Sequence, residues 1–280
     1  MLKLRVITAV VLVAVLMASI FGLPPLGLAL VFTVAVLIAS WEWAQLAGLT
    51  SILPRLLYGI SCAGLMALVA WYCQLFGVGV ATDIQLGRLQ DILGLGCLWW
   101  AIALLWVKGY PGSAALWGSV FMRAFMGYLV LIPAWLSLIF LRQHEQGIAL
   151  LLIMFALVAC ADIGAYFTGR AWGKAKLAVH VSPGKSWAGF WGGLTTSTLF
   201  AVLVWQLWGA EYMSLASVVT IALVTGLASV LGDLVESMVK RHQGVKDSGA
   251  ILPGHGGVMD RIDSITAASP VFALSIILVG

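Results

Sequence analysis

The chain has 280 residues, of which 62% are apolar and only 9% are charged. Soluble domains carry about 25% charged residues, so this composition excludes a soluble enzyme, a disordered chain and a coiled coil. Fifteen basic and eleven acidic residues leave a net charge of +4. That charge is too small for a nucleic-acid-binding protein of this size, and we attribute it to loops that orient the chain in a membrane.

Apolar segments long enough to cross a bilayer recur along the whole chain. A helix needs about 20 apolar residues to span the hydrocarbon core. Nine such segments occur, near residues 6–22, 24–41, 55–76, 91–107, 124–141, 148–169, 187–208, 213–237 and 262–279. We therefore expect an all-α polytopic membrane protein with about nine transmembrane helices. Residues 113–127 are apolar but shorter and contain Arg123, which predicts an interfacial helix or the entry to the fifth span.

The beginning of the chain admits two interpretations. Lys3 and Arg5 followed by an apolar stretch are also typical of a signal peptide. The stretch is long, however, and continues through residues 23–27 directly into a second apolar segment. This continuity favours a helical hairpin that stays in the membrane.

The cysteines give no sign of a metal site or a disulfide framework. Cys62, Cys73, Cys97 and Cys160 lie in or beside apolar segments, and none forms a C-x-x-C pair. We expect them to be small buried hydrophobic side chains.

The distribution of Lys and Arg predicts the orientation. With the N-terminus in the cytoplasm, nine spans place only Arg88 and Arg142 on the far side. The cytoplasmic side receives Lys3, Arg5, Arg55, Lys108, Arg123, Arg170, Lys174, Lys176, Lys185, Lys240, Arg241, Lys246 and Arg261. This asymmetry follows the positive-inside rule. We divide the chain into an N-terminal region, 1–150, with about five spans and the interfacial helix, and a C-terminal catalytic region, 151–280, that carries two polar segments.

The first polar segment surrounds Asp162 and residues 182–186 (SPGKS). A carboxylate within an apolar helix is costly and is a functional candidate, although it can also be a structural partner for Arg170 or for a neighbouring helix. The SPGKS stretch, with Ser182 and Lys185, leads into the seventh span and could cradle a phosphate with backbone N–H groups. The P-loop spacing is absent, so a lysine that only sets topology is the alternative.

The second polar segment, 232–264, concentrates four acidic side chains. Asp233 and Glu236 share a face at the end of the eighth span, and Asp260 and Asp263 share a face at the start of the ninth. Like charges crowded together repel one another unless a cation lies between them. Hard oxygen ligands select Mg²⁺, which usually completes its shell with substrate phosphates.

The same segment contains residues suited to phosphate. Its basic side chains can neutralise phosphate oxygens, and arginine can do so with two hydrogen bonds. The Pro-Gly-His-Gly-Gly turn at 253–257 lets the backbone approach a ligand closely, and His255 could donate to a phosphate or transfer a proton. The alternative is a salt-bridged loop that only closes a helical hairpin. The basic residues concerned are Lys240, Arg241, Lys246 and Arg261.

This segment resembles the signature of the phosphatidate cytidylyltransferases, or CDP-diacylglycerol synthases. That signature reads S-x-x-K-R-x-x-x-x-K-D-x-G-x-x-x-P-G-H-G-G-x-x-D-R-x-D, and residues 237–263 match it throughout. The upstream residues Gly232, Asp233 and Glu236, the stretch 161–169 with SPGK after it, and Trp41-Glu42-Trp43 also resemble bacterial members. The resemblance covers essentially the whole chain.

The resemblance implies a reaction of CTP with phosphatidic acid that gives CDP-diacylglycerol and pyrophosphate. It further implies an all-helical enzyme of the bacterial cytoplasmic membrane with a cytoplasmic active site. The expected partners are CTP, phosphatidic acid, the lipid bilayer and a second copy of the chain in a homodimer, and no nucleic acid is expected. The expected cofactor is Mg²⁺, with a second cation such as K⁺, held by Asp233, Asp260 and Asp263.

The remaining residues of the two segments receive roles by inference. We predict catalytic roles for Asp233, Asp260, Asp263, Lys240, Arg241 and His255. We predict substrate binding by Asp162, Ser182, Lys185, Lys246, Asp247, Gly254, Gly256, Gly257 and Arg261.

Two other functions stay open at this point. A related membrane enzyme could use CTP on another lipid, such as a polyprenol or an archaeal-type lipid, although the complete signature argues against it. An ion or solute transporter could use the acidic residues as its pathway. Against a transporter, the acids cluster with Lys and Arg at helix ends and not at the middle of the membrane.

Overall fold

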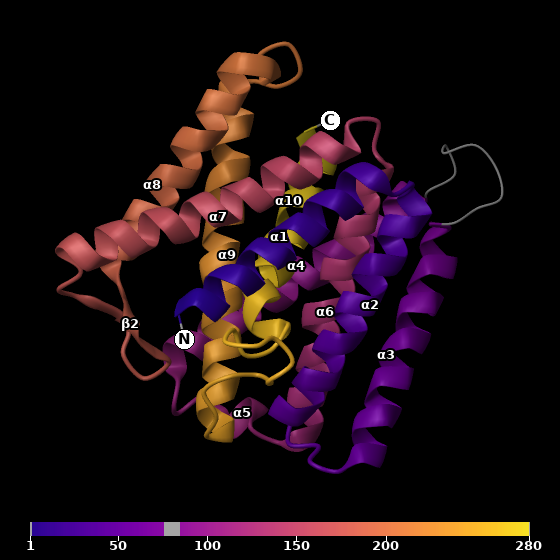
Figure 1. The fold of residues 1–280 in the computed structure, drawn as a ribbon, viewed down its shortest axis with the longest axis vertical. Coiled ribbons are helices and arrows are strands. Elements are labelled where there is room, and N and C mark those ends of the chain that lie inside the picture. Colours follow the sequence, from indigo (N-terminus) through magenta and orange to yellow (C-terminus); the bar gives the residue numbers. More distant parts are fainter. Residues whose placement is uncertain (1, 76–84, 280) are drawn as a thin grey trace.

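A computed structural model describes residues 2–75 and 85–279 of the chain, which fold into a bundle of helices with one small β-hairpin (Figure 1). In chain order the elements are α1 (Leu2–Gly22), α2 (Pro25–Leu46), α3 (Ile52–Cys73), α4 (Leu86–Gly109), α5 (Ala114–Trp117), α6 (Val120–Gln143), α7 (Gly147–Trp172), β1 (Lys176–Ala178), β2 (Ser182–Ser186), α8 (Trp187–Val204), the π-helical turn η1 (Trp205–Gly209), α9 (Leu215–Gln243) and α10 (Met259–Val279).

The predicted fold class, an all-α polytopic membrane protein, is confirmed. Among the described residues, eight helices are long and apolar enough to cross a membrane by length and composition. The first expected span corresponds to Val6–Gly22 of α1, which is apolar but shorter than the other eight. Each of the nine predicted segments is therefore helical over most of its described residues.

The segment 113–127 is partly the entry to the fifth span, as one of the two predictions had it. It contains the single-turn helix α5 and the first part of α6, with Gly118 and Ser119 between them. The Ser119 hydroxyl accepts a hydrogen bond from the N–H of Met122 and so caps the new helix. Only the second half of this segment belongs to the fifth span.

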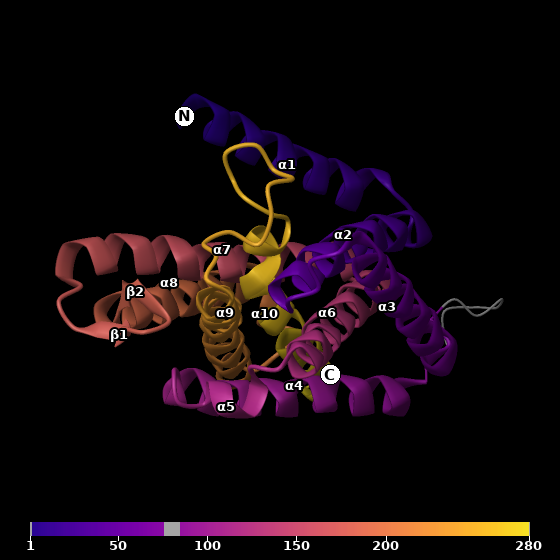
Figure 2. The same ribbon diagram turned by 90° about the horizontal axis from the view of Figure 1, so that it is seen from below.

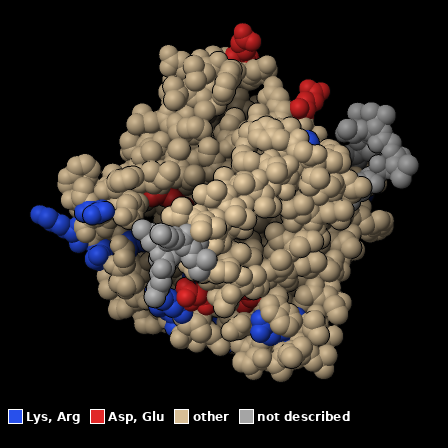
Figure 3. All heavy atoms as spheres, viewed as in Figure 1, with Lys and Arg blue, Asp and Glu red and all other residues tan. Residues whose placement is uncertain are grey.

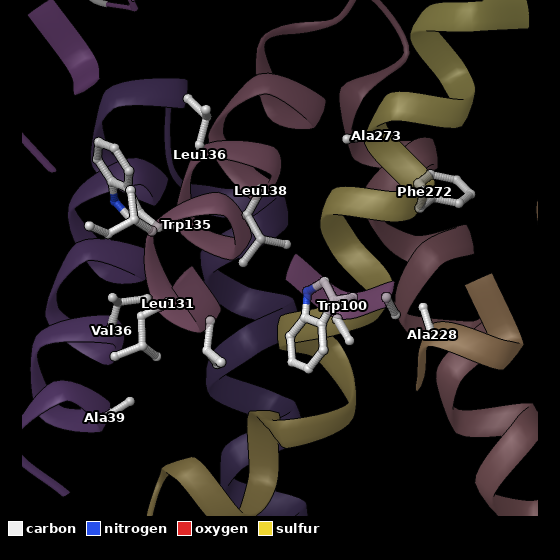
Figure 4. Packing of buried hydrophobic residues seen from close by; sticks show 14 of the residues in the cluster. Val36, Ala39, Trp100, Leu131, Trp135, Leu136, Leu138, Ala228, Phe272 and Ala273 are labelled. Atoms are coloured by element: carbon white, nitrogen blue, oxygen red, sulfur yellow. The ribbon is translucent and has the colours of Figure 1, made fainter. Parts of the chain in front are cut away.

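The helix α10 lies at the centre of the bundle. It packs against α9, α6, α4 and α7, and an end-on view shows α4 along one side and the pair α2–α3 on another (Figure 2). Interlocking apolar side chains from five helices fill the core between them (Figure 4). They include Val36 and Ala39 of α2, Trp100 of α4, Leu131 and Trp135 of α6, Ala228 of α9, and Phe272 of α10.

The pair α7–α8 forms a tight helical hairpin. A Cβ atom on Gly164 would overlap the Thr196 side chain, and one on Gly192 would overlap Thr168. Glycine therefore allows the two helices to touch through their backbones. The antiparallel strands β1 and β2 connect them, with Ala178 paired to Ser182.

The helix α1 lies apart from the main bundle, and the loop between α9 and α10 lies between them (Figure 2). The hydroxyl of Thr8 in α1 donates a hydrogen bond to the carbonyl oxygen of Pro253 in that loop, at 3.1 Å. Apolar side chains such as Val10 and Val13 are more than half exposed, as expected of a helix that faces lipid. The start of α1 is thus close to the glycine-rich turn.

Charge is distributed unevenly over the surface. Most of the blue side chains lie in the left and lower part of the view, with some red ones among them, and a broad tan surface separates them from red side chains at the top (Figure 3). All four cysteines are free, Cys62 and Cys73 being buried and Cys97 and Cys160 partly buried. The predicted burial is therefore confirmed for Cys62 and Cys73 and only partly met by Cys97 and Cys160.

Candidate active site

The crossing of α9 and α10 brings the four predicted carboxylates together. A Cβ atom on Gly232 would overlap the carbonyl oxygen of Asp263, so glycine is needed for the two backbones to approach. The next residue, Asp233, then lies close enough to Asp263 for their charges to repel each other, and Glu236 is acted on by both Asp260 and Asp263.

Two lysines offset this negative charge. Lys185 of β2 forms an ion pair with Asp233, with its Nζ 2.6 Å from Oδ2. Lys240 of α9 lies between Glu236 and Asp260, at 2.6 and 2.7 Å. The β-hairpin and the ends of α9 and α10 are thereby held to one another by charge.

Asp260 also anchors the loop between the two helices. Its Oδ2 accepts hydrogen bonds from the Ser248 N–H and hydroxyl, both at 2.9 Å, and from the Gly257 N–H at 2.8 Å. Its Oδ1 accepts from Lys240. Both oxygens of this predicted metal ligand thus already have protein partners.

Glu42 of α2 is a site residue to which the sequence analysis assigned no role. Only 1% of its surface is exposed. It accepts hydrogen bonds from the backbone N–H groups of Val258 and Met259, at 3.0 and 2.7 Å, and lies 3.4 Å from the Ser248 hydroxyl. These N–H groups are orphaned donors at the start of α10, so Glu42 caps that helix from a distance. The available signal was a carboxylate at the end of an apolar helix.

The glycine-rich turn is shaped by backbone conformations that glycine favours. Gly254 and Gly256 have φ angles of 76° and 81°. A Cβ atom on Gly257 would lie only 2.5 Å from a Glu42 oxygen. The carbonyl oxygen of His255 accepts a hydrogen bond from the Arg261 guanidinium. The Nδ1 atom of the His255 ring is buried without a hydrogen-bond partner among the described residues.

The structure differs from the prediction for the stretch 182–186. The stretch forms strand β2 and leads directly into α8, as predicted, but it is a strand and not a loop. Its binding of phosphate stays a prediction. The Ser186 hydroxyl caps α8 by accepting from the Gly189 N–H at 3.2 Å, so that donor is already occupied. Lys185 is directed to Asp233 instead, because the hairpin folds back against α9.

The other residues of the two segments surround this centre. Asp162 is exposed on α7, and its charge interacts with Lys185 and Asp233. Arg170, the alternative partner considered for it, bonds the Tyr166 hydroxyl. The Arg241 Nε lies 3.4 Å from the Val181 carbonyl oxygen. Among the remaining predicted residues, those with exposed side chains are Lys246, Asp247 and Arg261.

The fit of this centre to Mg²⁺ differs between its carboxylates. Within the described part of the chain, no group of three or more His, Cys, Asp or Glu side chains is spaced to hold a metal. Asp233 and Asp263 nevertheless offer hard oxygen donors whose charges act on each other, and a buried oxygen of Glu236 has no hydrogen-bond partner within the described residues. That chemistry suits a small divalent cation. Asp260 fits less well because its oxygens are already bonded.

Comparison with known proteins gives a family for this arrangement. The profile of the Cytidylyltransferase family matches residues 3–279. A protein of Pseudomonas aeruginosa named phosphatidate cytidylyltransferase is 42% identical over 98% of this chain and 96% of its own length. Proteins of the same name from Haemophilus influenzae and Brucella suis are 39% and 35% identical, each over 98% of this chain and over 98% and 92% of their own lengths. With acidic and basic side chains gathered at one end of a membrane bundle, and this similarity over nearly its whole length, the chain belongs to the Cytidylyltransferase family.

Proposed function

We propose that the chain is a phosphatidate cytidylyltransferase. A phosphate oxygen of phosphatidic acid attacks the α-phosphorus of CTP, the bond from that phosphorus to the bridging oxygen breaks, and CDP-diacylglycerol and pyrophosphate form. The observation that carries the proposal is the joining of Asp233, Asp263, Lys185 and Lys240 at the crossing of α9 and α10. The relatives' printed name supports the same reaction.

The chief obstacle to this reaction is electrostatic. Phosphatidic acid is anionic at neutral pH and CTP carries about four negative charges, so the site must hold two anions in line. Lys185, Lys240 and Arg241 would bind phosphate oxygens, with Lys246 and Arg261 on the exposed rim. Because the lipid phosphate is already ionised, positioning and charge neutralisation matter more than a strong general base.

The glycine-rich turn would hold nucleotide phosphates. Gly254 and Gly256 have positive φ angles, so the chain turns sharply there without side chains of its own at these two positions. His255, whose Nδ1 is buried without a partner in the described structure, could donate to a phosphate oxygen. Asp260 and Glu42 hold the turn in place from behind.

We also propose Mg²⁺ as the cofactor, with a second cation such as K⁺. Asp233 and Asp263 would hold the magnesium ion, and Asp260 stays a predicted third ligand. Bound there, the ion would neutralise charge on the reacting phosphates. The homodimer is likewise a proposal. The bacterial cytoplasmic membrane as location and the cytoplasmic orientation of the site are proposals supported by bacterial relatives and by the distribution of charge.

Purified protein incubated with labelled CTP, phosphatidic acid and Mg²⁺ tests the function. We expect cytidine label to enter the lipid extract, with one pyrophosphate released for each lipid labelled. A polyprenol phosphate in place of phosphatidic acid serves as the second acceptor. Label transfer to the polyprenol alone, or no CTP-dependent product with either lipid, would contradict the proposal.

A further inference from the structure

A hollow region lies at the end of the bundle opposite to the carboxylates. The helices α7 and α8 are in contact at Gly164 and Gly192. From there they diverge toward the other end of the bundle (Figure 1). Between their far ends is an apolar chamber of about 370 Å³, closed from behind by α9 and α10. Leu157, Ala201, Val218 and Phe272 are among its lining residues.

The chamber has the size of a single acyl chain. An apolar cavity of about 150 Å³ in a protein remains dry and takes up one benzene molecule. A chamber about two and a half times as large would hold roughly fifteen carbon atoms on the same scale. Water has few partners on these walls, whereas hydrocarbon chains surround the helices in a bilayer.

The wall of the chamber includes the π-helical turn η1. Its Trp205 ring lines the chamber and donates through Nε1 to the carbonyl oxygen of Met213, at 2.8 Å. Trp208 of the same turn lines both the chamber and an adjoining hollow. Turns of this kind widen a helix locally and are frequent at functional sites.

The adjoining hollow, of about 560 Å³, brings charge to the mouth of the chamber. It shares Gln146, Ala149 and Ile153 with the chamber and is also lined by Arg142 and Glu145. The Arg142 Nη2 donates to the Leu23 carbonyl oxygen at 3.3 Å, and its buried Nε has no hydrogen-bond partner in the described structure. One cation and one anion thus lie beside an apolar cavity.

We propose that the two hollows form a binding site for a bilayer phospholipid with a zwitterionic headgroup. One acyl chain occupies the chamber, the lipid phosphate pairs with the Arg142 guanidinium, and the amino group of the headgroup pairs with Glu145. Arginine is suited to phosphate because its planar fork can donate two hydrogen bonds.

This site is separate from the substrate site. Phe272 lies nine residues beyond Asp263 on α10, about 13 Å at the rise of an α-helix. Arg142 lies in the last turn of α6, in the hollow that adjoins the chamber. The bound lipid is therefore a resident of the opposite leaflet and not the acceptor of the proposed reaction.

Lipid retention by the full-length protein tests the proposal. The protein is purified in mild detergent, equilibrated with equal amounts of phosphatidylethanolamine and phosphatidylglycerol, and examined by native mass spectrometry. We expect one retained phosphatidylethanolamine per chain. Ala149→Trp and Val218→Trp, which fill the chamber, and Arg142→Gln, which removes the cation, should each lower retention at least tenfold.

Matched controls separate this site from ordinary contact with lipid. Arg88→Gln removes another far-side arginine, which lies over the Tyr72 ring instead, and Ile60→Trp adds bulk on the exposed face of α3. Both should retain lipid like the unaltered chain, and CTP-dependent activity should be unchanged in every variant. Equal retention by the filled variants, equal retention of the two lipids, or a change of oligomeric state in place of lipid loss would overturn the proposal.

Discussion

Ser248 lies between Asp260 and Glu42, the two carboxylates behind the glycine-rich turn. Its hydroxyl lies 2.9 Å from Asp260 and 3.4 Å from Glu42, and so favours Asp260. The two acidic groups are tolerated together because Lys240 and backbone N–H groups surround them. Buried charges persist in proteins only with such partners. The turn is therefore held from behind by groups that do not themselves need to touch substrate.

Replacement of Glu42 should weaken both folding and catalysis. In Glu42→Ala the N–H groups of Val258 and Met259 lose their acceptor, at a cost of about 1–3 kcal/mol for each buried donor. Glu42→Gln keeps one acceptor oxygen but turns an NH₂ group toward a donor, so it should be affected less. Thermal unfolding in detergent and the KM for CTP measure the two effects.

An exposed carboxylate provides the control for Glu42. Asp91→Asn on α4 removes a charge at the surface and should leave both quantities within error of the unaltered chain. If Glu42→Ala unfolds at the same temperature as Asp91→Asn, Glu42 does not cap α10.

Asp263→Asn and Asp233→Asn should test the proposed Mg²⁺ ligands. Each change keeps the size of the side chain but removes a negative charge. Because metal stabilisation of charge is worth several kcal/mol in the transition state, turnover should fall by on the order of 10²-fold or more. Folding should survive, since one of several repelling charges is removed. Activity titrated with Mg²⁺ measures the loss.

The acidic control for these variants lies at the other end of the molecule. Glu211→Gln changes an exposed residue between η1 and α9 and should retain full activity and the same Mg²⁺ dependence. Near-normal turnover of both aspartate variants at low Mg²⁺ would contradict their assignment as ligands.

Among the elements, the crossing of α9 and α10 decides the geometry of the site. The helix α9 runs from the Ser214 cap to Gly244, whose φ of 74° ends the helix and turns the chain into the loop. Lys240, Arg241 and His242 occupy its last turn, where cations favour the negative end of the helix dipole. This explains why α9 continues six residues beyond the predicted end of the apolar segment.

Gly232→Ala should separate the two helices at the site. The added methyl group would overlap the Asp263 carbonyl oxygen, so α9 and α10 must move apart. A misplacement of about 1 Å can reduce catalysis by roughly 10²-fold. We expect a loss of that order with retained membrane insertion, measured by turnover and by size-exclusion chromatography.

A glycine in open surroundings provides the comparison for this helix crossing. No heavy atom lies within 4 Å of a Cβ atom on Gly64 of α3, and alanine is the better helix former by about 1 kcal/mol. Gly64→Ala should therefore keep full turnover. Full turnover in Gly232→Ala as well would show that close contact at this crossing is dispensable.

For the whole molecule, the two ends of the bundle differ in chemistry. The end with the α9–α10 loop carries the ion pairs, the β-hairpin and most basic side chains, whereas the opposite end carries the apolar chamber (Figures 1 and 3). Positive charge is retained on the cytoplasmic side of membrane proteins. This asymmetry supports the proposed orientation, in which CTP reaches the site from the cytosol.

Labelling from outside the membrane should test that orientation. In bacterial cells with a permeabilised outer membrane, Glu211→Cys should react with a membrane-impermeant thiol reagent and Gly244→Cys should not. The unaltered chain, with four buried or partly buried cysteines, gives the background. Reaction at position 244 and not at 211 would reverse the orientation and place the site on the wrong side for CTP.

The sequence by itself determined the membrane class, the nine apolar helices and the two segments that carry the polar chemistry. Those features follow from local composition and spacing, because an apolar stretch must satisfy its backbone within its own helix wherever the rest of the chain lies. The convergence of Asp233 and Asp263 was also readable, since they lie on consecutive helices joined by one loop. The predicted position of Asp233 at the end of its helix was wrong, because α9 continues beyond it to Gln243.

Only the tertiary structure decided which groups hold those residues in place. Glu42 bonds Met259 across 217 positions of the chain, and Lys185 reaches Asp233 because an unpredicted strand returns toward α9. The apolar chamber likewise depends on the angle at which α7 and α8 separate. Such contacts are set by how rigid helices pack against one another, and the helical period of a single segment carries no record of which distant segment it meets.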